Sequence, residues 1–229
     1  MRATSGVTCA LAAATACLAL AACGGDDDAA RGDTATAPTA TAAAAAGTAS
    51  GLGAARFRAL DDVYAAQLQI DGPGEDADAV RLRAAAEPLL AACEALDEED
   101  PLLAAFRPMC PVLTRFTEQL ARLGSCGSAG PRACGRLVAN VRRTLSEFRR
   151  LSRRSDAAIE RSDLTAACKR ALATPEPSYE VIASFERAFA LLGRGAADEA
   201  GPALAAARDK AGRLPTARAA LERFRGGCG

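Results

Sequence analysis

Apolar side chains recur every three or four positions along most of the chain after residue 55, which is the spacing of one face of an α-helix. The clearest stripe is formed by Leu137, Val138, Val141, Leu145, Phe148 and Leu151. No stretch alternates apolar and polar residues with the period of two that is typical of a strand. The pattern therefore predicts an all-α domain, folded as a bundle of about five to seven helices.

Prolines, serines and acidic residues predict where several of these helices begin and end. Pro88 lies inside the second helix and is expected to kink or divide it, because proline removes a helical hydrogen bond. The acidic run at residues 97–100 is expected to cap the next helix, since negative charge stabilises a helix N-terminus. The helix after Cys134 is expected either to continue to Ala173 or to break near Ser155.

Small residues mark the C-terminal part of the chain. The segments 188–195 and 200–207 faintly resemble one tetratricopeptide hairpin, in which small residues let two antiparallel helices approach closely. A last short helix begins at Pro215 and is expected to end at Gly226-Gly227.

The first 22 residues have the layout of a secretory signal, with Arg2 near the start, an Ala- and Leu-rich middle and small residues at the end. The sequence Leu20-Ala21-Ala22-Cys23 matches all four positions of the lipobox and resembles that of bacterial lipoproteins. The resemblance implies that Cys23 is lipidated and becomes the new N-terminus. Acyl chains such as palmitate would then anchor the protein on the extracytoplasmic side of the cell membrane. A plain signal peptide cut after Ala22 and an uncleaved anchor helix are the alternatives.

Three segments follow from this interpretation. Residues 1–22 form the lipoprotein signal peptide, and residues 23–53 contain the lipidated Cys23 and an Ala- and Thr-rich tether. The tether has hardly any aliphatic side chain, so it cannot bury enough apolar surface to offset the entropy of ordering and is expected to be disordered. Residues 54–229 are left for the helical domain, whose sequence carries no recognisable family motif.

Nine cysteines are present, and those at residues 9, 17 and 23 leave with the signal peptide or take the lipid. An even six remain in the domain: Cys93, Cys110, Cys126, Cys134, Cys168 and Cys228. In an exported protein an even set indicates disulfides, although six cysteines allow fifteen pairings. Proximity favours Cys126 with Cys134, Cys93 with Cys110, and Cys168 with Cys228. No metal site is expected, because neither a Cys-x-x-Cys spacing nor a histidine occurs.

Charge is strongly segregated although the chain as a whole balances to zero. Residues 61–100 contain 12 acids and 2 bases, a net charge of −10, whereas residues 132–170 contain 11 bases and 4 acids, a net charge of +7. Six arginines lie beside the apolar stripe: Arg142, Arg143, Arg149, Arg150, Arg153 and Arg154. Two interpretations stay open. The arginines bind an anionic envelope polymer, lipid or protein, or they pair with the acidic helices or simply solvate the outer face of the bundle.

Histidine is absent, which excludes Ser-His-Asp and Cys-His enzymes. No nucleophile elbow, phosphate-binding loop or EF-hand pattern occurs, so no catalytic residue, metal, cofactor or nucleic-acid partner is expected. The sequence favours a lipid-anchored binding or scaffolding module of the cell envelope, with the membrane as a partner through the N-terminal lipid. The alternative is a carboxylate-based envelope enzyme or accessory subunit. The oligomeric state is left open.

Overall fold

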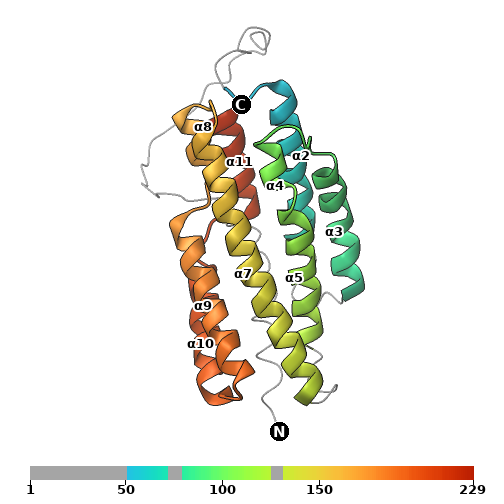
Figure 1. Ribbon diagram of the computed structural model, residues 1–229, viewed down its shortest axis with the longest axis vertical. Helices are drawn as coiled ribbons and strands as arrows, with labels where there is room; N and C mark the ends of the chain where they lie inside the picture. The colour runs from blue at the N-terminus through green and yellow to red at the C-terminus, as the bar shows by residue number, and fades with distance from the viewer. Residues whose placement is uncertain (1–50, 72–78, 125–130) are drawn as a thin grey trace, which may run out of the picture.

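The computed structural model describes residues 51–71, 79–124 and 131–229, and all regular secondary structure in these ranges is helical (Figure 1). In chain order the helices are α2 (Ala54–Asp71), α3 (Ala79–Glu94), α4 (Leu103–Phe106), α5 (Met109–Gly124), α7 (Pro131–Arg161), α8 (Ala166–Leu172), α9 (Glu176–Gly193), α10 (Ala197–Ala211) and α11 (Ala217–Cys228). Seven of these described helices have 12 residues or more, whereas α4 has 4 and α8 has 7. The prediction of an all-α bundle of about five to seven helices is confirmed.

Helix α7 is the longest described element, with 31 residues and a length of about 46 Å at 1.5 Å per residue. It runs diagonally through the middle of the molecule in Figure 1, and it packs against both α5 and α9. The predicted stripe is its core face, since five of the six stripe residues are buried: Val138, Val141, Leu145, Phe148 and Leu151. Burial of this face therefore leaves the other side of α7 toward solvent.

The C-terminal end of α7 differs from both expectations for this helix. The helix continues through Ser155, whose side chain is buried, and it ends at Arg161, well before Ala173. Thr165 then caps a separate helix, α8, because its hydroxyl accepts a hydrogen bond from the backbone N–H of Cys168 at 3.2 Å. The break therefore lies at residues 162–165.

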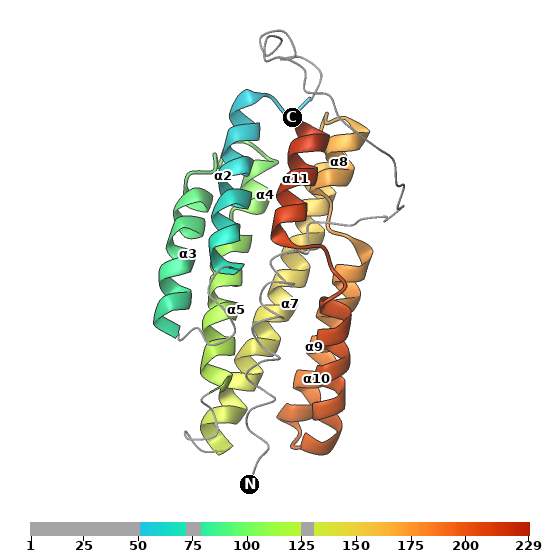
Figure 2. The ribbon, with the colours of Figure 1, turned by 180° about the vertical axis from the view of Figure 1, so that it is seen from behind.

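Two hydrophobic cores follow one another along the long axis. The first core joins α2, α3, α4, α8 and α11 with the start of α5 and the end of α7. In it, the ring of Phe224 stacks on Phe57 and Tyr64 with 5.0 Å between centroids. This core also buries Leu52, which precedes the first residue of α2. The second core joins α5, α7, α9 and α10. Figure 2 shows α11 beyond the end of α10, which separates the two cores along the molecule.

Two disulfides between described cysteines both lie in the first core. The Cys93–Cys110 bond joins α3 to α5 with 6.3 Å between Cα atoms, and the Cys168–Cys228 bond joins α8 to α11 with 4.5 Å. Both pairings confirm the predictions from proximity. Each bond connects helices that are separated by other elements in the chain, so this end of the molecule is held covalently.

Two expected helix boundaries do not occur. Helix α3 is not divided at Pro88, and Ala86 and Leu89 on either side of this proline are buried in the first core. Helix α11 continues through Gly226-Gly227 to Cys228. The physical reason is close packing, since a Cβ on Gly227 would lie 2.7 Å from the Cβ of Ala171 on α8. Glycine here allows α8 and α11 to approach each other and does not end the helix.

The acidic run before α4 caps that helix, as predicted. Asp100 Oδ1 accepts hydrogen bonds from the backbone N–H groups of Leu102 at 2.9 Å and Leu103 at 3.3 Å. Asp97 Oδ1 accepts one from the N–H of Glu99 at 2.9 Å. These carboxylates therefore satisfy backbone donors that have no helical partner.

Helices α9 and α10 form an antiparallel hairpin at one end of the molecule (Figure 1). Ala188, Ala200 and Ala207 are fully buried in it. Gly195 takes a positive φ of 79° in the connecting turn, a conformation that glycine adopts without a steric penalty. Small side chains and a glycine turn thus bring α9 and α10 close together.

Candidate anion-binding face

The six arginines of the basic block cover the outer side of α7, and we call this set the arginine face. At about 100° per residue they span an arc of about 140°, opposite the buried stripe. Five of them are exposed, and Arg149 is half-buried. From Arg142 to Arg154 they follow about 18 Å of the helix axis. Packing of the apolar face therefore fixes the direction in which the cationic face points.

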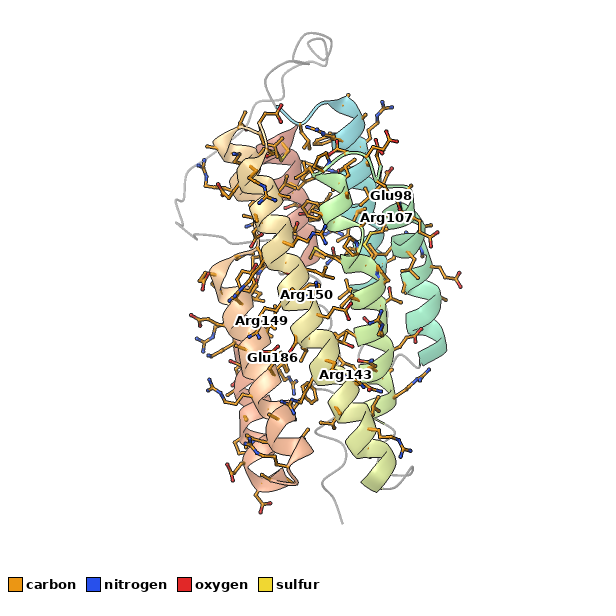
Figure 3. All side chains as sticks on the ribbon, in the orientation of Figure 1. Glu98, Arg107, Arg143, Arg149, Arg150 and Glu186 are labelled. Atoms are coloured by element: carbon orange, nitrogen blue, oxygen red, sulfur yellow. A yellow bond between two sulfur atoms is a disulfide. The ribbon has the colours of Figure 1, made fainter. Side chains whose placement is uncertain are left out.

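One row of the arginine face lies on the side of α9 and consists of Arg142, Arg149 and Arg153. Arg149 Nη1 forms an ion pair with Glu186 Oε2 at 2.8 Å, and Ser146 Oγ donates a hydrogen bond to Glu186 Oε1 at 2.7 Å. Figure 3 shows Arg149 and Glu186 together at this seam. Arg153 lies over the ring of Tyr179, with its guanidinium carbon 5.7 Å from the centroid. Contacts with α9 therefore hold two of the three arginines of this row.

The other row lies toward α5 and consists of Arg143, Arg150 and Arg154, which helical spacing places on one side of α7. Figure 3 shows Arg143 and Arg150 on this helix. Glu147 on this side pairs with Arg115 of α5 at 3.0 Å. Arg143 Nη2 donates to Oδ1 of the neutral Asn140 at 2.5 Å. Within the described part of the chain, Arg150 and Arg154 have no hydrogen bond or ion pair, and neither has Arg142 of the first row. These three guanidinium groups are therefore available to an external anion.

Two shallow hollows flank α7. The larger, which we call the α9-side groove, has a volume of about 600 Å³ and is lined by Ala139, Arg142, Arg143, Ser146, Arg149 and Glu186. The smaller, toward α5, has a volume of about 330 Å³ and includes Arg115, Asn140, Arg143 and Glu147. Arg143 borders both hollows, so it links the two sides of the arginine face.

The acidic block does not neutralise the arginine face among the described residues. Asp61 accepts two hydrogen bonds from Arg225 of α11, at 2.6 and 2.9 Å, and Asp100 pairs with Arg56 of α2 at 2.5 Å. The ion pairs described for α7 go instead to α5 and α9. Among the described residues, the alternative in which the acidic helices pair with the α7 arginines is therefore not found, and Asp61 and Asp100 are bound by cations of α11 and α2 instead.

Ion pairing at the first core also shifts the pKa of both aspartates. The hydrogen bond from Arg225 holds the pKa of Asp61 below its usual value. For Asp100, burial raises the pKa, but hydrogen bonds from Arg56 and from two backbone N–H groups outweigh this effect and lower the pKa overall. Both carboxylates are therefore more stably ionised in the folded protein than in the unfolded chain.

Glu186, Ser146 and Tyr179 complete the row toward α9, and sequence reasoning did not identify them. Ser146 lies four residues after Arg142, so helical spacing alone places it on the same face. Glu186 and Tyr179 come from another helix, and no local pattern links them to α7. The Tyr179 hydroxyl donates to Asp156 at 2.5 Å, and burial together with this hydrogen bond raises its pKa.

A third hollow, of about 540 Å³, lies beside the Cys93–Cys110 disulfide and includes Glu94 and Glu98 in its lining. Glu98 forms an ion pair with Arg107, and 71% of its side chain is exposed. These features are typical of a surface ion pair rather than of a general acid. The described residues also contain no group of three acidic or cysteine side chains placed to hold a metal ion. The arginine face is thus the better candidate site.

Several predicted features lie outside the described residues: the signal peptide, Cys23, most of the tether, and Cys126. Cys134, the predicted partner of Cys126, is disulfide-bonded. Among the helices that the structure describes, none combines the length and the apolar character needed to cross a bilayer.

Comparison with known proteins identifies no relative. No family model, curated protein sequence or solved structure matches the chain. Its function is therefore inferred from the residues and their geometry alone.

Proposed function

We propose that this protein is a membrane-anchored lipoprotein of the extracytoplasmic side, and that its helical domain binds an anionic partner through the arginine face. The anchoring is supported by the lipobox at residues 20–23. The extracytoplasmic location is supported by the disulfides, which persist in oxidising compartments. The binding is supported by one observation. Helix α7 exposes arginines along one side, and three of them have no partner among the described residues.

The chemistry of arginine suits this role. Its guanidinium stays charged and presents five donors in a planar fork that matches carboxylate and phosphate oxygens. Clustered exposed cations also attract anions over several ångströms, which raises association rates and makes binding sensitive to salt. Because the opposite face of α7 is packed in the second core, the backbone positions from which these arginines extend are fixed.

The binding proposal is tested by replacing all six arginines of the face with glutamine. The wild-type protein should bind an anionic fraction of the cell envelope at low salt and leave it at high salt, whereas the variant should not bind. A control variant replaces six exposed arginines elsewhere: Arg58, Arg170, Arg187, Arg194, Arg213 and Arg218. Equal loss in both variants would show that total charge matters and that the arginine face has no special role.

The anchoring proposal is tested by Cys23→Ala. This change removes the thiol that takes the lipid, so incorporation of labelled palmitate should disappear and the protein should leave the membrane fraction. Cys17→Ala, inside the signal segment, is the control and should leave both properties unchanged. Tight membrane association of the Cys23→Ala variant would favour an uncleaved anchor helix.

A further inference from the structure

The α9-side groove contains more cations than anions. Three guanidinium groups and one carboxylate line it, which gives a net charge of +2. Both oxygens of Glu186 are already used, by Ser146 and Arg149, at 2.7 and 2.8 Å. Arg142 has no partner among the described residues, and Arg143 donates only to a neutral amide. Two adjacent arginines therefore border the groove without a counter-charge.

The bound carboxylate of Glu186 shows what chemistry this side of α7 accepts. A hydroxyl and a guanidinium from successive turns, Ser146 and Arg149, hold one oxyanion at hydrogen-bonding distance. Arg142 and Arg143 lie about 100° apart around the helix, so they reach a ligand from different directions. A tetrahedral phosphate offers acceptors on more sides than a planar carboxylate does. It is therefore the better ligand for this pair.

We propose that the α9-side groove binds a phosphate group of a linear phosphate polymer, with Arg142 and Arg143 as its charged contacts. This inference rests on the proposed binding of an anionic partner and adds the chemical class and the position. Arg143 also borders the hollow toward α5, so a polymer that leaves the groove can cross α7 there. Beyond it, Arg150 and Arg154 provide two further unpaired cations along the helix.

The shape of the cationic surface favours a chain over a flat membrane. The arginine face is about one helix wide, and carboxylates border it on both sides, Glu147 toward α5 and Glu186 toward α9. A bilayer would meet these acids together with the arginines, whereas a chain can follow the strip between them. The outer side of α7 from Ala139 to Ala157 also carries no large apolar side chain that could insert among lipids.

Glu186 limits the affinity of the groove for phosphate, because its negative charge lies beside the proposed ligand. Glu186→Gln keeps an oxygen for the Ser146 hydroxyl and removes the charge. We therefore expect this variant to bind phosphate polymer about two- to fivefold more tightly than the wild type. Glu180→Gln removes the same charge from an exposed position on α9 and should have a smaller effect.

The test titrates the purified, oxidised protein with inorganic polyphosphate and follows the heat of binding at two salt concentrations. Binding should weaken with salt, and Arg142→Gln/Arg143→Gln should weaken it about tenfold at low salt. The control Arg187→Gln/Arg218→Gln changes two exposed arginines elsewhere and should keep wild-type affinity. Thermal unfolding of each variant shows whether the fold is preserved.

The outcomes that would contradict these expectations differ for the proposed groove and for the proposed function. If Arg150→Gln/Arg154→Gln abolishes polyphosphate binding while Arg142→Gln/Arg143→Gln does not, the groove is the wrong site but an anionic partner stands. Equal affinity for polyglutamate overturns the phosphate class. Binding only to vesicles of equal parts phosphatidylglycerol and phosphatidylcholine overturns the linear polymer. If the wild type binds none of these, the proposed anion binding itself is wrong.

Discussion

Arginines at the two ends of the molecule have opposite environments. At the first core, Arg56 and Arg225 pair with aspartates of neighbouring elements, and two disulfides join the helices around them. Along α7, arginines next to the second core extend into solvent, and three lack any partner among the described residues. Arg56 and Arg225 at the first core therefore have internal partners, whereas three arginines of α7 have none among the described residues.

The difference shows why a net charge of zero says little about the surface. The acids and bases of this chain are numerous enough to cancel, but helix packing decides which of them meet. Two acids of the 61–100 block, Asp61 and Asp100, are bound by cations of α11 and α2. Helix α7 is held by apolar packing, so its cationic side needs no internal partner.

The largest expected effect on stability comes from the two disulfides in the first core. Cys168→Ala/Cys228→Ala opens a link between residues 60 apart and should lower the free energy of unfolding by about 4 kcal/mol. Cys93→Ala/Cys110→Ala opens a link of 17 residues and should cost about 3 kcal/mol. Urea denaturation of both oxidised variants measures the difference. The longer link is expected to stabilise more because it removes more conformational entropy from the unfolded chain. A larger loss of stability on removal of the shorter link would contradict this explanation.

The next largest effect on stability is expected where α8 and α11 are in close contact. Gly227→Ala places a methyl group against Ala171 and should destabilise the protein by about 1 to 3 kcal/mol. Gly226→Ala is the control, because no atom lies within 4 Å of its added Cβ. It should be neutral or stabilise by up to about 1 kcal/mol through helix propensity. Equal thermal stability of both variants would show that the two helices separate easily.

Local signals in the sequence predict much of this architecture. The period of the apolar stripe depends only on residues within α7, and the cap at Asp100 depends on a run of neighbours. Short separation also favours the Cys93–Cys110 pairing. The glycines near the C-terminus mislead for the same reason. From the local sequence these glycines predict the end of a helix. Instead, Gly227 allows α11 to contact α8, which lies some 60 residues earlier in the chain.

Only the α7 residues of the candidate site can be predicted from the sequence. The arginines of α7 follow from composition and helical spacing, because they belong to one continuous element. Glu186 and Tyr179 belong to α9, and only the packing of α9 on α7 brings them to this face. The partners of the acidic block are likewise tertiary, so their pairing with α2 and α11 could not be predicted from charge counts.

A smaller effect concerns the acids of the first end. The pKa of Asp100 is lowered in the folded state, so its ionisation stabilises the fold above the ordinary value of 3.8. This contribution should disappear as the pH falls from that value through the lowered pKa. Asp100→Asn keeps a capping side chain but loses this acid dependence, as urea midpoints across the acid range would show. Asp62→Asn, at an exposed neighbouring position, should retain the wild-type profile.

The smallest effect on stability is expected at the other end. Arg142→Gln, Arg143→Gln, Arg150→Gln and Arg154→Gln together should change the free energy of unfolding by less than about 0.5 kcal/mol, because these exposed side chains make no ion pair among the described residues. At low salt the variant should be at least as stable as the wild type, since close like charges repel and their removal relieves that repulsion. Urea denaturation at low and high salt measures the change in the free energy of unfolding and its dependence on salt. A loss of more than about 1 kcal/mol would show that the arginines support the fold, and an anion would then have to compete with internal partners.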